Sequence, residues 1–283
     1  MSGIARRGLL GAAPGLLLAA PLPVVRYPRP MRQLLPERSL PLLLLQRALA
    51  LSGQQVEVQP SKHVMVQARA VQELATGGDQ LDLTWTVTNR EREAMLRPIR
   101  VPLYRGLYGW RLLLVRRGDG QRFAGVRSLA ELAVYRFLQG TDWPDTAVLR
   151  ANGLRVDTAA SFDSLFKMLR AGRADAFPRG VTEIAWEQPQ QAEWFETEPG
   201  LALHYPSAEY FFVSPGNHGL ADWLERGMER LVASGEHERL LLQLHGDAIK
   251  AARLRERRVI ELANPELSEA TPLRRRELWW RPT

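Results

Sequence analysis

Short apolar runs alternate with longer amphipathic stretches along the first part of this chain. They predict, in order, a strand at 24–27, a helix at 39–51, a strand at 56–59, a helix at 64–75 and a strand at 81–85. The last strand lacks strong alternation, as expected for a strand covered on both faces of a parallel sheet. The segment Pro28-Arg29-Pro30 ends the first strand, because proline restricts its own backbone and that of the residue before it. This order of elements predicts an α/β fold.

The second half of the chain continues the alternation of strands and helices. Its predicted elements are strands at 134–138 and 154–158, a helix at 161–169, strands at 201–205 and 210–213, and a helix at 218–232. Apolar side chains recur every three or four residues from Phe162 to Leu169, which predicts a helix with one face in the core.

A charged, glycine-containing segment separates the two halves. Residues 116–122, RRGDGQR, lie between two apolar segments, which is typical of a crossover between domains. We therefore expect two lobes: residues 24–116 together with 215–283 form the first, and residues 117–214 form the second.

The composition limits the possible chemistry. Of 283 residues, 45% are hydrophobic and 24% are charged, as in a globular protein. There is no cysteine, which excludes disulfides, thiolate metal sites and a lipid-modified amino-terminal cysteine. The five histidines have no metal-binding spacing and no partnered serine, so we expect no metal, no other cofactor and no nucleophilic triad. The net charge of +7 is modest and no nucleic-acid-binding module accompanies it, so we expect no nucleic-acid partner.

The amino terminus has the pattern of an export signal. Arg6 and Arg7 precede an apolar run at 8–20 that is short for a membrane span and ends in small residues. We assign residues 1–23 to an export signal or an uncleaved anchor, since Pro21 and Pro23 are unfavourable near a cleavage site. The expected location is the periplasm.

Polar and aromatic side chains gather at the end of the third predicted strand. Trp85, Thr86 and Thr88 place an aromatic ring and hydroxyl groups where open α/β sheets bind ligands, and Tyr27 ends the first strand. Four arginines follow closely: Arg90, Arg92, Arg97 and Arg100. A guanidinium matches a carboxylate with two parallel hydrogen bonds, so one of the four is a candidate clamp for an acid group, whereas most surface arginines are simply solvated.

This segment resembles the first-lobe signature of the family 3 extracellular solute-binding proteins, the receptors of polar amino acid transporters. Thr88, the pair Glu91-Arg92 and the segment Pro102-Leu103-Tyr104 stand at the places of the family motif. On this resemblance, the arginine that binds the ligand carboxylate maps to Arg92. The chain has one residue more between threonine and arginine than the usual pattern, so Arg90 is the alternative.

The resemblance covers most of the chain. Residues 161–177 are similar to the family's helix that ends in Gly-Arg-x-Asp, and residues 209–246 to its closing strand and return helix. The resemblance implies a periplasmic-binding-protein type 2 fold, with two lobes that each have a central, mostly parallel sheet flanked by helices and are joined by two crossover strands. It also implies a monomer whose partners are a small-molecule ligand and a membrane permease or sensor.

The second lobe contributes further candidate ligand-binding residues. Thr141, Asp142 and Trp143 precede a helix start, where backbone amides favour an anion, and in the resembled family this loop meets the ligand carboxylate. Ordinary helix capping by Asp142 is the alternative. Family members carry an aspartate for the ligand ammonium after the strand near 177, but here Arg179 stands there. An arginine would repel an ammonium group, which favours an acidic ligand unless Glu183 points inward.

We therefore expect a binding protein that closes two lobes on a small polar, carboxylate-bearing solute, for delivery to a transporter or for sensing. One alternative is a dehydratase-like enzyme on the same scaffold, with Glu183 as its general acid. Another is a scaffold that has lost binding and serves interaction only.

Overall fold

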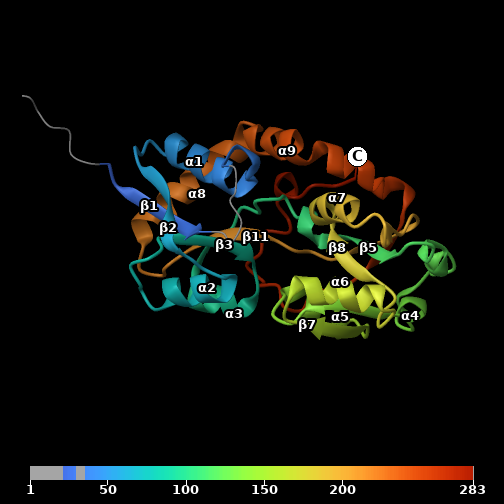
Figure 1. Cartoon of the computed structure of the whole chain (residues 1–283). Helices are drawn as coiled ribbons and strands as arrows, with labels where there is room; N and C mark the ends of the chain where they lie inside the picture. Colours follow the sequence, from blue (N-terminus) through green and yellow to red (C-terminus); the bar gives the residue numbers. More distant parts are fainter. Residues whose placement is uncertain (1–21, 30–35, 283) are drawn as a thin grey trace, which may run out of the picture.

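The structure is a computed structural model that describes residues 22–29 and 36–282. The predicted export segment lies outside the described residues, apart from Leu22 and Pro23. Two bodies of mixed helices and strands lie side by side, and the C-terminal part of the chain runs along both (Figure 1). No helix among the described residues is both long and apolar enough to cross a membrane.

The first lobe is built on two small groups of strands covered by helices. β1 (Val24–Arg29) pairs in parallel with β2 (Glu57–Val64), and β11 (Glu209–Val213) lies antiparallel between β3 (Leu83–Val87) and β4 (Arg97–Ile99). The helices of this lobe are α1 (Leu40–Leu51), α2 (Gln67–Ala75), α3 (Arg90–Met95) and α8 (His218–Ala233). The apolar side chains of α1 and α8 are buried against each other, which covers one side of the strands.

The second lobe has a larger sheet. Its strand order is β12 (Arg258–Glu261), β10 (Leu201–His204), β5 (Trp110–Arg116) and β8 (Phe177–Gly180), with β9 (Phe195–Thr197) also paired to β5. A bridge from Phe137 to Ala176 links β8 to the parallel pair β6 (Arg136–Gly140) and β7 (Arg155–Ala159). Its helices are α4 (Leu129–Leu132), α5 (Pro144–Ala151), α6 (Phe162–Arg170) and α7 (Val181–Gln190).

The local patterns predicted from the sequence are confirmed for the main elements. In α6, for example, Leu165 and Leu169 are fully buried, as the three- and four-residue spacing predicts. The expected parallel pairing holds for β1–β2 and β6–β7. The strands near the crossovers pair mostly antiparallel, because the chain passes back and forth between the lobes there.

The chain enters the second lobe earlier than the charged segment 116–122. β5 pairs only with strands of the second lobe, so the crossing lies between β4 and β5, and the charged segment follows inside that lobe. β5 is a buried central strand of the sheet in that lobe, because it is hydrogen-bonded to β10 on one side and to β8 on the other.

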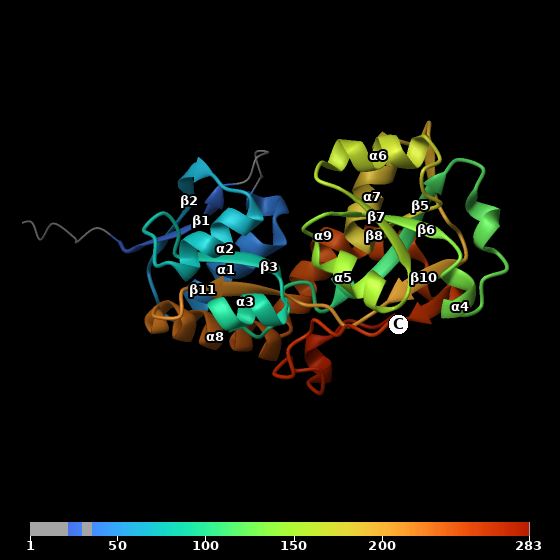
Figure 2. The ribbon, with the colours of Figure 1, turned by 90° about the horizontal axis from the view of Figure 1, so that it is seen from below.

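The C-terminal part adds connections to the two expected crossover strands. Helix α9 (Glu236–Ala252) packs against α1 and α8 of the first lobe and against α7 of the second (Figure 1). β12 then pairs with β10, and the segment after it lies along the boundary between the lobes (Figure 2). The sequence placed residues 110–116 and 258–261 in the first lobe, whereas their strands β5 and β12 pair within the second sheet; the other expected lobe boundaries remain a prediction.

Candidate functional site

A cavity of about 160 Å³ lies between the two lobes. The first lobe contributes its side chains from α2, β3 and β11, and the second contributes them from β5, β8, α7 and the start of α5. The residues that line it are Gln67, Val87, Tyr108, Arg111, Trp143, Pro144, Asp145, Arg179, Glu183 and Glu209. The cavity is smaller than the pockets of about 300–1,000 Å³ that hold drug-sized ligands, so it suits a small solute.

Arg92, in the first turn of α3, does not itself line this cavity, but it bonds to Gln67 and Val87, which do. Its Nη1 donates to Thr86 Oγ1 at 2.8 Å and to the Val87 carbonyl at 2.5 Å, and its Nη2 donates to Gln67 Oε1 at 3.1 Å. Partial burial lowers the pKa of Arg92, and nearby carboxylates, including Glu209, oppose that effect. Nε–H and one Nη2–H have no acceptor among the described residues, so two donors remain for a ligand.

Arg111 is the buried centre of a hydrogen-bonded network in the second lobe. It lies on β5 and donates to Asp145 at 2.5 Å, to Glu183 at 3.0 Å and to the Tyr205 hydroxyl at 3.0 Å. The Tyr205 hydroxyl in turn donates to Asp145. A buried guanidinium needs such partners, because a buried charge without them costs several kcal/mol. Arg111 therefore shapes the wall of the cavity and has its charge balanced within the protein.

Arg179 is paired in the same way. Its Nε and Nη2 donate to Glu187 at 2.7 and 2.6 Å, and Nη2 also lies 3.0 Å from Glu183. The guanidinium carbon is 4.8 Å from the centre of the Trp143 ring, within cation–π range. Burial raises the pKa of Glu183, but Arg179 and Arg111 outweigh it and the net effect is a lowered pKa. The expected repulsion of an ammonium group by Arg179 loses its basis, because two carboxylates neutralise this arginine.

Glu209 is the carboxyl group of the cavity that remains unpaired. It begins β11, opposite Val87 of β3, and its side chain makes no hydrogen bond or ion pair with any described residue. Burial raises its pKa to about 8; repulsion by Glu183 adds to this, and Arg92 opposes it. A cation placed beside Glu209 would stabilise its ionised form.

The ligand-binding residues predicted in the first lobe form two groups, one hydrogen-bonded to α3 and one packed in the lobe. Thr86 is buried and holds Arg92, and Thr88 donates to Glu93 at 2.7 Å. Tyr27 and Trp85 pack against each other with ring centres 5.7 Å apart, and neither lines the cavity. The aromatic pair thus belongs to the packing of the first lobe.

Of the ligand-binding residues predicted in the second lobe, two line the cavity and two do not. Trp143 and Arg179 line the cavity, whereas Thr141 and Asp142 are exposed in the preceding loop and do not line it. Asp142 provides no helix cap, since α5 begins after Trp143 without a side-chain cap. Arg90, the alternative to Arg92, is exposed, and its Nε donates to the Leu267 carbonyl at 3.4 Å.

Sequence reasoning missed several residues of the cavity, namely Gln67, Tyr108, Arg111, Asp145 and Glu209. Two of them carried a usable signal. Arg111 is a lone charge near the start of the apolar run WRLLLV, and Glu209 is a lone acid at the start of EYFFV. A charge in a strand that reads as buried is rarely placed there without a partner or a role.

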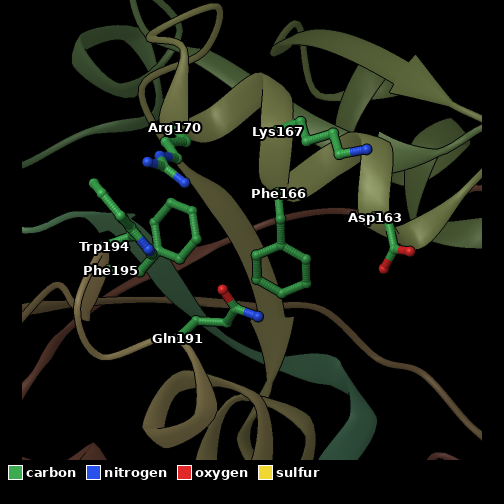
Figure 3. A pocket seen from close by; sticks show the side chains of 7 residues that line it. All are labelled: Asp163, Phe166, Lys167, Arg170, Gln191, Trp194 and Phe195. Atoms are coloured by element: carbon green, nitrogen blue, oxygen red, sulfur yellow. The ribbon is translucent and has the colours of Figure 1, made fainter.

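Another hollow, of about 210 Å³, lies on the second lobe between α6 and the segment after α7 (Figure 3). There the guanidinium carbon of Arg170 lies 3.2 Å from the centre of the Trp194 ring, so the chain's own cation covers one face of this indole. Among the described residues, no group of three histidine, aspartate or glutamate side chains could hold a metal ion.

Comparison with known proteins gives a clear result at the level of structure alone. Neither a protein-family model nor a curated protein matches the sequence. The VFT2 domain of BvgS from Bordetella pertussis is similar with a TM-score of 0.58 and 19% identity, over 78% of this chain and 93% of that one. An ancestral arginine-binding protein is similar with a TM-score of 0.55 and 16% identity, over 78% and 97%. The GluR0 ligand-binding core from Nostoc punctiforme gives 0.52 and 16%, over 79% and 99%.

These likenesses show the fold. The chain has the two-lobed periplasmic-binding-protein type 2 architecture, which confirms the fold class that the sequence resemblance implied. The cavity lies between the lobes of that architecture.

Proposed function

We propose that this protein is a solute-binding protein whose two lobes close on a small polar solute that carries both a carboxylate and a cationic group. The observation that carries the proposal is that Glu209, a carboxyl of the cavity lining without a hydrogen-bond partner among the described residues, lies within electrostatic range of the partly free guanidinium of Arg92. Each lobe contributes a wall, so a bound solute would hold the closed state.

Arg92 is the proposed carboxylate site. Thr86, Val87 and Gln67 fix its guanidinium, and two N–H groups stay available for a carboxylate. A pre-ordered arginine loses little side-chain entropy when it binds, which favours affinity. The charges of Arg111 and Arg179 are balanced by Asp145, Glu183 and Glu187, so Arg92 is the strongest attraction for an acid group.

Glu209 is the proposed cation site. At neutral pH its pKa of about 8 leaves it largely protonated, and a ligand ammonium or guanidinium would convert it to the ionised form. The solute of this proposal thus differs from the purely acidic ligand expected from the sequence. It agrees with similar structures that hold bound arginine, lysine or glutamate.

The biological setting is also part of the proposal. We place the protein in the periplasm, exported through residues 1–23, as a monomer that delivers its solute to a membrane permease or reports it to a sensor. The similar structures include substrate-binding proteins of amino acid ABC transporters, which supports a permease as the partner.

Calorimetry with three classes of solute tests the proposal. Zwitterionic amino acids should bind, whereas simple amines and simple dicarboxylates should bind at least about tenfold more weakly. Arg92→Ala should weaken binding about 10- to 100-fold, because it removes charge-assisted hydrogen bonds. Arg90→Ala is the matched control, since its side chain contacts the tail and not the cavity. Tight binding of a dicarboxylate without any zwitterion would refute the cation site.

Proton release gives an independent test of Glu209. Binding measured at pH 7 in two buffers of different ionisation enthalpy should show that a proton leaves the protein, and Glu209→Gln should abolish this release. Unchanged proton release in Glu209→Gln would assign it to another group.

An enzyme on this scaffold is the second candidate. Glu183, the expected general acid, has a lowered pKa and stays ionised, so it cannot donate a proton near neutral pH. Glu209 has the raised pKa that such a role requires. Formation of product from a bound solute, lost in Glu209→Gln, would establish catalysis and replace the receptor proposal.

A further inference from the structure

A larger cavity, of about 530 Å³, lies where the C-terminal segment passes β5 and β10 of the second lobe. Trp110 on β5 and His204 on β10 form its floor, and Trp279, Trp280 and Arg281 of the tail form its wall. Its volume lies within the range of about 300–1,000 Å³ that is typical of small-molecule sites.

Aromatic rings define the shape of this cavity. Trp110 lies against His204 with ring centres 4.2 Å apart, and Trp280 meets Trp110 edge-on at 6.2 Å and 85°. The tail is fixed in place, because the Trp280 amide donates to the Arg105 carbonyl at 2.6 Å and Trp279 Nε1 donates to the Pro272 carbonyl at 2.9 Å. Rings held at right angles in this way offer both a face and an edge to a planar aromatic ligand.

Several donors around the cavity have no partner among the described residues. The indole N–H groups of Trp110 and Trp280 have no acceptor among the described residues, and Arg281 forms no ion pair among them. A neighbouring hollow shares Trp280 and is lined by Lys250, Arg253 and Arg255, of which Arg253 pairs with Glu256. The Glu261 carboxylate is bonded to His204 Nδ1 at 2.7 Å, so the unpaired donors beside the aromatic wall favour an anion.

The hollow in Figure 3 provides a contrast to the tail cavity, because its tryptophan is already covered by an arginine of the protein. There, Arg170 lies over the Trp194 ring, so the cation and the ring face satisfy each other. At the tail, His204 covers one face of the buried Trp110 ring, whereas no arginine or lysine of the described residues stacks on Trp280, whose half-exposed ring remains available to a ligand.

We propose that the cavity formed by Trp110, His204, Trp280 and Arg281 is a binding site for a small aromatic carboxylate. The ring would pack on Trp280 beside the edge of Trp110, and the carboxylate would meet Arg281. Trp110 is adjacent in β5 to Arg111, which lines the cavity between the lobes, so the two sites lie on opposite sides of this strand. The inference does not depend on the function proposed for the interlobe cavity.

Calorimetry of the full chain with indole-3-acetate, tryptamine and cyclohexylacetate tests this site. Indole-3-acetate should bind, tryptamine should fail because its charge is reversed, and cyclohexylacetate should bind at least about fivefold more weakly because it lacks a π face. Trp280→Leu should weaken indole-3-acetate binding about tenfold, and Arg281→Gln about two- to fivefold, as for an exposed ion pair.

Three control variants locate the binding. Trp194→Leu and Arg170→Gln alter the other tryptophan–arginine pair and should leave the affinity unchanged. Arg92→Ala should also leave it unchanged, which separates this site from the interlobe cavity. Circular dichroism establishes that each variant is folded. The proposal is overturned if tryptamine binds as well as indole-3-acetate, if folded Trp280→Leu and Arg281→Gln bind normally, or if Arg92→Ala abolishes binding.

Discussion

The unpaired carboxyl of Glu209 should make the stability of the free protein depend on pH, and its removal should abolish this contribution. In the folded protein its pKa is about 8, against an ordinary value of 4.5. Between these values the folded state holds a proton that the unfolded state has lost. Unfolding therefore releases a proton, and the free energy of unfolding should fall as the pH rises from 4.5 to 8.

The size of the effect follows from the same numbers. At about 1.4 kcal/mol per pKa unit, the full difference would correspond to an upper bound of about 4–5 kcal/mol. Glu209 is only half-buried and faces the cavity, so water reduces this value. We expect about 2 kcal/mol over this pH range.

The assay compares wild type with Glu209→Gln, which keeps the shape of the side chain and cannot ionise. Urea unfolding is followed at pH 5, 6, 7 and 8 by tryptophan fluorescence and by circular dichroism. Subtracting the two proteins cancels every other titrating group, so the difference isolates Glu209. A difference that stays constant across this pH range would refute the assignment of a raised pKa to this carboxyl.

Three further changes test the packing on which both cavities depend. Gly106→Ala should cost about 2–5 kcal/mol, because φ is +76° and a Cβ there would lie 2.4 Å from the tail indole. Gly77→Ala, with φ +71° and free space, should cost only about 1–2 kcal/mol, and equal losses in urea unfolding would contradict the tail contact. Arg179→Met should lower the free energy of unfolding by about 3–5 kcal/mol, because it leaves the buried Glu187 carboxylate unpaired. Adding Glu187→Leu should restore most of this loss. If the losses of the two single variants simply add in the double variant, the two side chains are not coupled. Burial lowers the pKa of His237 to about 4, so its contribution to the free energy of unfolding is full above about pH 6.5 and is lost as the pH falls through 4. His237→Gln should therefore reduce the fall of the melting temperature between pH 6.5 and 4. An unchanged fall would assign the acid sensitivity to other groups.

The secondary structure and the fold class followed from local features of the chain. The apolar spacing from Phe162 to Leu169 predicted a helix with a buried face, and Leu165 and Leu169 are buried in α6. The threonines of β3 and Arg92 were recognised together, and the structure joins Thr86 to Arg92 by a hydrogen bond. These features involve residues close in sequence, where periodicity and strand ends carry most of the information.

The assignment of single residues to the cavity was less complete, because it depends on pairing between distant segments. Arg179 was expected to act on a ligand with its charge, but Glu187 on the next helix neutralises it. Glu209 was expected only as part of a strand, and the pairing of that strand with β3 brings it to the cavity edge.

The sequence by itself determined the alternation of strands and helices, the absence of thiol chemistry and the resemblance that implied two lobes. Only the tertiary structure decided which charges are satisfied within the protein and which are left for a ligand. The physical reason is that the effective charge of a side chain depends on burial and on partners within a few ångströms, and those partners can lie far apart in sequence, as the 94 residues between Arg111 and Tyr205 show. The same holds for the tail, whose tryptophans form a cavity only because the C-terminal segment returns to β5 and β10.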